Sequence, residues 1–316
     1  MVSPVPVTLL TGFLGAGKTT LLNRLLADPD APPTAVIVNE FGALGIDGRL
    51  IVGASDSVIE LRNGCICCEV REDLRRTATE LLQKRARFFR PYRFEALIVE
   101  ASGLAAPGPL IQTFLLDPML AAETRVGGVV ALAHAGKIVE QLTEFPEASA
   151  QIACADHVIL NHLDHAADIE GAERAVRAVA PLARLERATH ADVELGAVRL
   201  GTGGCPEGWR FPALATHASG IVTGSFRTQA ELDLQKLKMF LQFVASRRGW
   251  EVLRLKGIFR CRGLERAVVA NGVYQWLELG PGSMYAPESS GLVVIGRRLD
   301  LAELQRGWAA IAGDSG

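Results

Sequence analysis

A glycine-rich segment near the start of the chain has the residue types and spacing of a phosphate-binding loop. It reads Gly12-Phe13-Leu14-Gly15-Ala16-Gly17-Lys18-Thr19 and matches the pattern G-x-x-x-x-G-K-[ST] at every required position. The glycines let backbone N–H groups point at phosphate oxygens, and the following helix adds the partial positive charge of its N-terminus. We expect Lys18 to reach the β- and γ-phosphates and the Thr19 hydroxyl to ligate Mg²⁺. The candidate nucleotide contacts of this loop are Gly12, Gly15, Ala16, Gly17, Lys18, Thr19 and Thr20.

Two acidic residues follow short apolar segments that we predict to be strands. Glu100 follows Ala96–Val99, and a carboxylate at the carboxyl end of a strand beside the phosphate loop can hold Mg²⁺, usually through water. Three residues further on, the amide of Gly103 can turn toward the γ-phosphate. Glu40 follows Ala35–Val38 and can orient the attacking water, because hydrolysis depends on positioning and charge stabilisation. Either acid can also simply begin a loop. The candidate catalytic residues are Lys18, Glu40 and Glu100, and the candidate magnesium ligands are Thr19 and Glu100.

A further strand candidate, which begins at His157, ends in Asn161-His162-Leu163-Asp164. The carboxylate of Asp164 can accept two hydrogen bonds from the N1–H and N2–H₂ donors of guanine, whereas adenine presents no such pair. A mismatched base would leave buried polar groups unpaired, so an aspartate here selects GTP. Asn161 and Asp164 are therefore the candidate base contacts. The competing interpretation is an Asx turn that caps the next helix.

Three cysteines lie within four residues, in Gly64-Cys65-Ile66-Cys67-Cys68. Thiolates at this spacing suit a soft or borderline ion such as Zn²⁺, Co²⁺ or Cu⁺. Three thiolates leave one position of a tetrahedral site open, which suits transfer of the ion better than permanent binding. A helix that begins near Cys68 would lower the pKa values of the thiols, as would Arg62. A redox sensor and three small buried side chains are the alternatives.

The remaining cysteines and the histidines give weaker signals. Cys154, Cys205 and Cys261 are isolated, and we expect them to be small buried hydrophobic residues. The histidines form no His-rich tract. His162 and His165 are three residues apart and can share a metal face, but a position beside the base site explains them equally well. Neither is assigned as a ligand.

Predicted strands and helices, which must position these residues, alternate along the first two thirds of the chain. Apolar runs without alternation indicate strands buried on both faces, and the helical segments between them indicate a parallel sheet. The sequence therefore predicts a doubly wound, mostly parallel α/β domain over residues 1–200. The expected strands are Val5–Leu10, Ala35–Val38, Ala96–Val99, Gly127–Leu132 and His157–Leu160, and the expected helices include Lys18 to about Leu26, Arg71–Lys84 and Ile169–Ala180.

The pattern changes in Gly201–Pro212, where glycine and proline crowd together and periodicity disappears, and we place a linker at residues 201–217. Residues 218–316 are then expected to form a smaller α+β domain with an antiparallel sheet. Its expected helices lie around Leu232–Val244 and Leu301–Ile311, and its expected strands are Val252–Phe259, Ala267–Ala270, Tyr274–Leu279 and Leu292–Ile295.

The bulk composition is that of an ordinary globular chain of two domains. The chain has 316 residues, of which 49% are hydrophobic, and a formal net charge of −2. This charge gives no reason to expect nucleic acid or an anionic membrane as a partner. The apolar N-terminus lacks a basic region and a cleavage site, and no apolar run reaches the roughly 18 residues that span a bilayer. We expect a cytoplasmic protein, and leave a homodimer open.

Together these motifs resemble the CobW-type family of P-loop GTPases. The match covers nearly the whole chain, including a CobW C-terminal domain from about residue 218. The resemblance implies a GTP-dependent metal chaperone or metallocofactor insertase. It also implies that the cysteine motif binds Zn²⁺ or Co²⁺, that Mg²⁺-GTP strengthens this binding, and that hydrolysis releases the ion to a client metalloprotein or cofactor-synthesis enzyme. The matching stretches are TLLTGFLGAGKTTLL, NEFG, NGCICC, VEASGLAAP, QIACADHVILNHLD, LRLKGIF and LELGPGS.

The chain departs from the family pattern at three places. His162 stands where the family usually has the lysine of N-K-x-D, and an imidazole can stack on the base as the lysine stem does. We therefore expect guanine preference to persist through Asp164. Ala43 follows N-E-F-G where many relatives have glutamate, so an extra carboxylate near the metal site is missing. The His-rich metal-collecting loop of many relatives is absent, which favours delivery or sensing over storage.

Two other classes of function compete with metal delivery. A P-loop kinase for a small molecule would need an acceptor site and a lid, and the sequence shows no Arg-rich lid candidate. A switch or interaction module would use the second domain to recruit a partner and the cysteines to sense redox state or metal. A phosphorylated product would favour the kinase, and a nucleotide response lost on oxidation would favour the switch.

Overall fold

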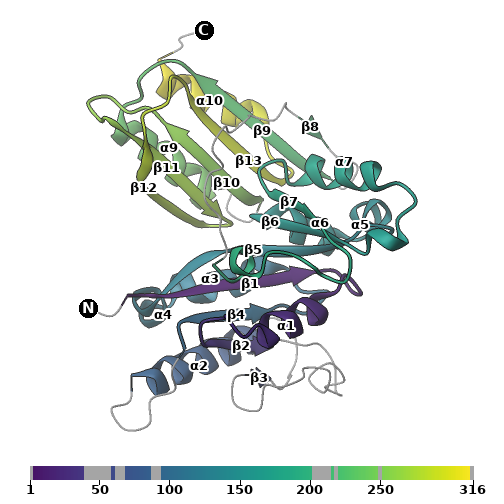
Figure 1. Ribbon diagram of the computed structural model, residues 1–316. Helices are drawn as coiled ribbons and strands as arrows, with labels where there is room; N and C mark the ends of the chain where they lie inside the picture. The colour runs from purple at the N-terminus through teal and green to yellow at the C-terminus, as the bar shows by residue number, and fades with distance from the viewer. Residues whose placement is uncertain are drawn as a thin grey trace. The chain divides into compact units, whose positions relative to one another are not determined.

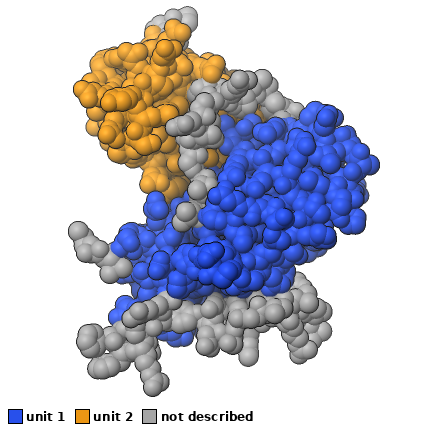
Figure 2. Space-filling view, in the orientation of Figure 1, with its two compact units in different colours: residues 1–206 blue, residues 207–316 orange. Residues whose placement is uncertain are grey.

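The computed structural model describes residues 3–38, 58–60, 68–86, 94–200, 215–216, 220–247 and 251–313. The chain divides into two compact units, residues 1–206 and 207–316, which Figure 2 colours separately. Each unit has its own sheet and its own hydrophobic core. Cys205, Glu40, Cys65 and Cys67 lie outside the described residues, as does the expected linker except for residues 215–216, which form a short strand instead.

The first unit is built on a seven-stranded sheet in which every described pairing is parallel. The strand order is β3-β2-β4-β1-β5-β6-β7, so the strand that precedes the phosphate loop lies at the centre (Figure 1). This confirms the doubly wound α/β domain, because the chain moves to one side of β1 first and to the other side later. The strands are β1 (Val5–Gly12), β2 (Thr34–Val38), β3 (Val58–Glu60), β4 (Ala96–Glu100), β5 (Thr124–His134), β6 (His157–Asn161) and β7 (Arg184–Arg187).

Helices cover both faces of this sheet. On one face, α1 and α8 pack on β1 and share a core with Leu10, Val36 and Ile98. On the other face, α3 and α6 pack on β1 and β5. The central strands are therefore buried on both sides, which explains their continuous apolar runs. The helices are α1 (Lys18–Ala27), α2 (Cys68–Arg85), α3 (Pro107–Leu116), α4 (Pro118–Glu123), α5 (Ile138–Glu144), α6 (Pro146–Cys154), α7 (Ile169–Val179) and α8 (Leu195–Leu200), with a 3₁₀ turn η2 (Leu163–His165).

A buried arginine joins α8 to the end of α1. One guanidinium nitrogen of Arg199 donates to the carbonyl oxygen of Leu25 at 3.0 Å and to the carboxylate of Asp28 at 2.8 Å. The hydrogen bond from Arg199 lowers the pKa of Asp28 below its usual range. The carbonyl of Arg199 also accepts a 2.9 Å hydrogen bond from the hydroxyl of Thr8 in β1. These bonds fix the helix that begins at the phosphate loop against the sheet.

The second unit has a six-stranded antiparallel sheet in the order β12-β11-β10-β13-β9-β8. Helices α9 and α10 pack on each other and against the sheet around Trp308, whose ring approaches Phe226 at 6.3 Å between centroids. This confirms the α+β architecture expected for the second domain. The elements are β8 (Ala215–Thr216), β9 (Ile221–Thr228), α9 (Leu234–Arg247), β10 (Val252–Phe259), β11 (Arg266–Val273), β12 (Trp276–Tyr285), β13 (Ser290–Arg297) and α10 (Leu301–Ala312).

One strand of the second unit begins later than expected. The strand expected from Tyr274 starts two residues later, because Tyr274 has a positive φ of 53° and lies in the tight turn between β11 and β12. Cys154 and Cys261 are buried as expected, and burial raises the pKa of Cys261. Among the described helices, none combines the length and apolar character needed to cross a membrane.

Candidate nucleotide-binding site

The phosphate loop joins the carboxyl end of β1 to α1, and its glycines occupy positions that other residues could not. Gly17 has a φ of 103°, and a Cβ added there would lie 2.4 Å from Nδ2 of Asn161. Gly12 has a φ of 142°, and its Cβ would lie 2.5 Å from the carbonyl oxygen of Leu132. The loop is therefore clamped between the ends of β5 and β6, and only glycine fits this geometry.

Lys18 and its neighbours lie at the start of α1, where the loop can present them to phosphates. The amine of Lys18 donates to the carbonyl oxygen of Gly12 at 2.8 Å and of Phe13 at 3.5 Å, so it folds back over the loop. Lys18 and Thr19 are half-buried, whereas Thr20 is exposed. A half-buried ammonium group directly over the loop is placed to bind phosphate oxygens.

Glu100 lies beside β1 at the same edge of the sheet. The register aligns Leu10 with Glu100, Glu100 with Val38, and Val38 with Glu60, so one row of residues crosses β1, β4, β2 and β3. Glu100 is buried, with 6% of its surface exposed. A buried carboxylate oxygen and the half-buried hydroxyl of Thr19 are hard oxygen donors, and this donor set fits Mg²⁺.

The segment after β4 is held against the phosphate loop by contacts from two other elements. The backbone N–H of Ala101 donates to the carbonyl oxygen of Leu10 at 2.8 Å. A Cβ added to Gly103 would lie 2.6 Å from the side chain of Leu14, so this glycine touches the loop. The side-chain amide of Gln151, in α6, donates to the carbonyl oxygens of Gly103 at 3.0 Å and of Ala105 at 3.1 Å. The amide expected to face the γ-phosphate thus belongs to a fastened segment.

Asn161 connects the phosphate loop to the turn that follows β6. Its side chain is fully buried, and its Nδ2 donates to the carbonyl oxygen of Ala16 at 3.0 Å. Its Oδ1 accepts from the backbone N–H of Ala191 at 2.9 Å, and its carbonyl oxygen accepts from the N–H of Ala135 at 2.8 Å. Asn161 therefore positions three loops relative to one another, and the base contact expected of it stays a prediction.

Asp164 lies in η2, within residues 161–165, which we call the base turn. Its carboxylate is part-exposed and lies 3.1 Å from Nε2 of His165. The next helix, α7, is capped by Asp168, whose carboxylate accepts from the N–H of Gly171 at 2.8 Å. The helix-capping interpretation of Asp164 is therefore wrong, and its carboxylate faces the surface where a ligand can reach it.

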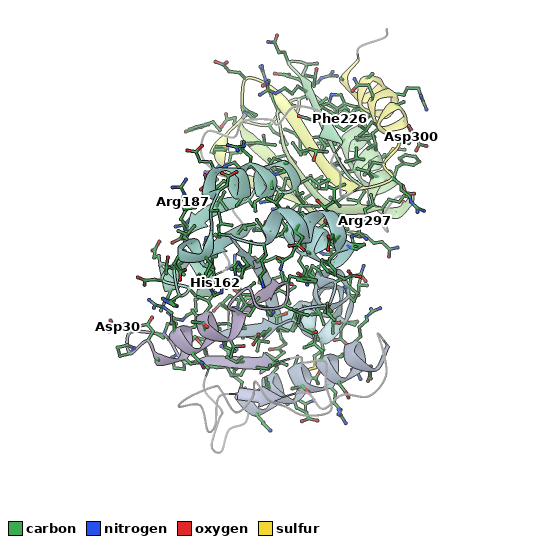
Figure 3. All side chains as sticks on the ribbon, turned by 90° about the vertical axis from the view of Figure 1, so that its right-hand side faces the viewer. Asp30, His162, Arg187, Phe226, Arg297 and Asp300 are labelled. Carbon is green, nitrogen blue, oxygen red and sulfur yellow. The ribbon has the colours of Figure 1, made fainter. Side chains whose placement is uncertain are left out.

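His162 replaces a lysine stem with a ring that stacks on another ring. It has a φ of 60°, at the point labelled in Figure 3. Its imidazole stacks on that of His134, at the end of β5, with 4.5 Å between centroids and 21° between planes. A Cβ on Gly17 would lie 3.5 Å from Nε2 of His162, so the ring borders the phosphate loop. Burial, and then the electrostatic influence of His162 and Lys137, lower the pKa of His134.

Comparison with known proteins decides the family. Residues 6–187 match the family described as "CobW/HypB/UreG, nucleotide-binding domain". Residues 221–312 match the "Cobalamin synthesis protein cobW C-terminal domain". The chain belongs to the CobW family.

Relatives of this CobW-family chain include proteins named for zinc. The zinc chaperone YjiA of Escherichia coli is 30% identical over 317 residues, covering 98% of this chain and 99% of that protein. The zinc chaperone CobW of a Sinorhizobium species is 43% identical over 140 residues, or 42% of this chain and 38% of that protein. The crystal structure of Zn(II)-bound YjiA GTPase superposes with a TM-score of 0.74 at 25% identity, covering 98% of this chain and 99% of that one.

Of the three cysteines in the motif of this CobW-family chain, the structure describes only Cys68. Cys68 is the first residue of α2, as expected, and β3 ends at Glu60. Cys65 and Cys67 lie in residues 61–67 and Glu40 lies in residues 39–57, and both intervals are outside the described residues. Because the sheet is parallel, β3 ends at the same edge as β1, and three strand spacings of about 4.8 Å separate them by roughly 14 Å.

Two residues of this site were not predicted from the sequence. Gln151 lies in a short helix whose other residues are mostly small or apolar. The sequence therefore contains no indication that its amide binds another segment. His134 ends β5, and its contact with His162 depends on the parallel register that aligns it with Asn161. The one signal in the sequence was that both β5 and β6 end in polar residues, at the edge where parallel sheets bind ligands.

Proposed function

We propose that this protein couples GTP hydrolysis to the delivery of zinc to a client protein. The chain is a GTPase of the CobW family, with a phosphate loop that matches its pattern at every required position. Zinc is the favoured cargo because relatives aligned along 98% and 42% of the chain are named zinc chaperones. The YjiA GTPase, which superposes on the whole chain, was also crystallised with zinc bound.

We assign the roles of the nucleotide residues from the sequence pattern and, except for Glu40, from their described positions. Lys18 and the loop amides bind the phosphates, while Asp164 accepts hydrogen bonds from guanine. Thr19 and Glu100 would hold Mg²⁺, which neutralises charge on the β- and γ-phosphates when bound. Glu40 orients a water for attack on the γ-phosphorus. The bond from that phosphorus to the β–γ bridging oxygen breaks, and GDP and phosphate leave.

We assign cargo binding to the three thiolates of Cys65, Cys67 and Cys68. Zinc prefers four ligands, so three thiolates leave one position for water or for a group of the client. An open position lets a client ligand enter before the thiolates leave, which favours transfer over storage. Reduced thiols of this kind persist in the reducing cytoplasm, where we place the protein.

The observation that carries the proposal is a row of aligned residues at or near the carboxyl ends of four strands. Glu60, Val38, Glu100 and Leu10 are aligned across β3, β2, β4 and β1. The chain segments that leave β4 and β2 therefore start between the phosphate loop and the segment that carries the cysteines. We propose that loss of the γ-phosphate changes the contacts of Gly103 and Glu40 and, through them, the position of the thiolates of the cysteine motif. This provides a short path from hydrolysis to metal release.

The test is the zinc affinity of the reduced protein in two nucleotide states. We expect at least tenfold tighter zinc binding with Mg²⁺ and a non-hydrolysable GTP analogue than with Mg²⁺-GDP, equivalent to about 1.4 kcal/mol of coupling. A chromophoric chelator competing for zinc gives both affinities, and the same titration with Co²⁺ tests the choice of metal.

Two matched variants distinguish zinc binding by the cysteine motif from zinc binding by other cysteines. Replacing Cys65, Cys67 and Cys68 by serine should remove the nucleotide-dependent zinc binding. Cys154→Ala removes a buried thiol in α6, outside the motif, and should leave it unchanged. Equal zinc affinity in both nucleotide states of the unmodified protein would refute coupled delivery.

A further inference from the structure

We propose that His162, Asp164 and His165 form a second transition-metal site in the base turn, and that a metal bound there competes with guanine nucleotide. The chemical class is a borderline divalent ion such as Zn²⁺, bound by two imidazoles and one carboxylate. The competition rests on the proposed role of Asp164 in guanine recognition. The metal site itself does not.

The three side chains already converge. One ligand atom from each of His162, Asp164 and His165 lies within 4.8 Å of the other two. Nε2 of His165 lies 3.1 Å from the carboxylate of Asp164. Imidazole nitrogens and carboxylate oxygens bind zinc at about 2.0–2.2 Å, so ligand atoms around one ion lie roughly 3.2–3.6 Å apart. Small side-chain rotations close the remaining gap.

The backbone of the base turn holds these side chains in place. The N–H of His165 donates to the carbonyl oxygen of His162 at 3.1 Å, which closes the 3₁₀ turn. The rings of His162 and His165 lie 6.0 Å apart between their centroids. A Cβ on Gly136 would lie 2.5 Å from the carbonyl oxygen of His165, so the loop after β5 packs directly on the turn. A metal would meet a positioned set of ligands.

One imidazole of the proposed site, that of His162, also lacks a partner that a ligand could supply. Nε2 of His162 and Nδ1 of the stacked His134 are buried without a hydrogen-bond partner in the described part of the chain. An unpaired buried polar atom costs free energy. Metal coordination of His162, or the small ring rotation that accompanies it, would remove part of this cost.

Competition follows because Asp164 has only two carboxylate oxygens. Guanine recognition uses both of them, one for N1–H and one for N2–H₂. The oxygen nearest His165 is the one a metal would bind, which leaves a single acceptor for the base. By linkage, nucleotide lowers metal affinity by the same factor that metal lowers nucleotide affinity. A high zinc concentration would therefore favour release of GTP from the protein that carries zinc.

The metal arm of the test uses a variant with Cys65, Cys67 and Cys68 replaced by serine, which removes the thiolates. Titration with Co²⁺ should give one site with visible d–d absorption and without sulfur-to-metal charge transfer. His165→Gln should abolish this site. His165 is largely exposed, with 64% of its side-chain surface accessible, so the substitution does not threaten the fold. His190→Gln changes another exposed histidine and should leave the site intact.

The nucleotide arm measures binding of a fluorescent GTP analogue with excess Mg²⁺, with and without Zn²⁺. Zinc should weaken binding at least tenfold in the serine variant and in its His190→Gln derivative, because one charge-assisted hydrogen bond to the base is lost. Zinc should have no effect on the His165→Gln derivative. Cobalt absorption that survives His165→Gln, or zinc binding without weaker nucleotide binding, would overturn the proposal.

These outcomes are independent of the proposed delivery function. Failure of delivery would appear in the unmodified protein as thiolate-bound zinc with the same affinity in both nucleotide states. Failure of the second site would appear in a protein that has no thiolates in the motif.

Discussion

The two ends of the nucleotide site are built from different materials. At the phosphate end, glycine backbone and one lysine define the site, and the φ angles of Gly12 and Gly17 exclude other residues. At the base end, the geometry depends on the side chains of His134, His162 and Asp164. A site formed by the backbone requires glycines at fixed spacing, which can be recognised in the sequence. A site formed by side chains can be formed by different residues in different proteins. The histidine in place of lysine occurs at the second kind of site.

Asn161 is the physical link between these two ends. Its amide donates to Ala16 of the phosphate loop and accepts from Ala191 beside the base turn. Gly17 lies against the same amide. Substitutions at either end should therefore have separable effects only when they leave Asn161 in place.

Lys18→Ala tests the phosphate end most severely. Loss of the ammonium group that lies over the loop should lower kcat for GTP hydrolysis about 10²- to 10³-fold. Phosphate release at saturating GTP measures this. Lys84→Ala removes an exposed lysine in the last turn of α2 and should leave kcat unchanged. A Lys18→Ala enzyme within threefold of normal would mean that the loop does not position phosphate as described.

Gly17→Ala attacks the link between the two ends. The new Cβ would lie 2.4 Å from Nδ2 of Asn161 in a backbone conformation that disfavours alanine. We expect the free energy of unfolding to fall by about 1–3 kcal/mol and nucleotide affinity to fall with it. Urea denaturation and nucleotide titration measure the two effects. Gly196→Ala, in α8 with open space around it, should be neutral or slightly stabilising.

Asp164→Asn tests the base end alone. Asparagine keeps one acceptor but presents a donor to N1–H or N2–H₂, so GTP affinity should fall about 10- to 100-fold while XTP affinity rises. Competition between the two nucleotides gives the selectivity directly. Asp168→Asn is the control, since asparagine caps a helix as well as aspartate does, and it should bind GTP normally. Unchanged selectivity in Asp164→Asn would place guanine recognition elsewhere.

Gln151→Leu tests the fastening of the segment after β4. The carbonyl oxygens of Gly103 and Ala105 would lose their donor, and the free energy of unfolding should fall by about 1–3 kcal/mol. Chemical denaturation measures the loss. Gln112→Leu, in α3, should cost less than about 1 kcal/mol, because the amide nitrogen of Gln112 has no partner among the described residues. Similar costs for the two variants would mean that the Gln151 bonds contribute little.

The sequence predicted the parts of the fold that have long apolar runs or steep periodicity. The central strands, α1, α7 and the start of α2 at Cys68 are found where the pattern placed them. The short helices α3, α4 and α6 were not predicted. Each begins with proline, at Pro107, Pro118 and Pro146. Proline at the first helical position indicates a helix start, but a prediction based on apolar periodicity does not use this signal.

The site was less predictable than the fold for a physical reason. The phosphate loop and Glu100 follow directly from strands, so local pattern was enough. The stack of His134 on His162 joins residues 28 positions apart, and the bonds of Gln151 to Gly103 span 48 positions. Such contacts depend on strand register and helix packing, which a single sequence does not specify.

Coupling of hydrolysis to zinc release is best tested by following zinc and phosphate in the same single turnover. The zinc-loaded protein with bound GTP is mixed with Mg²⁺ and a chromophoric zinc chelator in a stopped-flow instrument, while a phosphate sensor reports hydrolysis. We predict that zinc leaves at the rate of hydrolysis or phosphate release, one ion for each GTP, and stays bound with a non-hydrolysable analogue. Zinc transfer at the same rate with GTP and with the analogue would contradict coupled delivery.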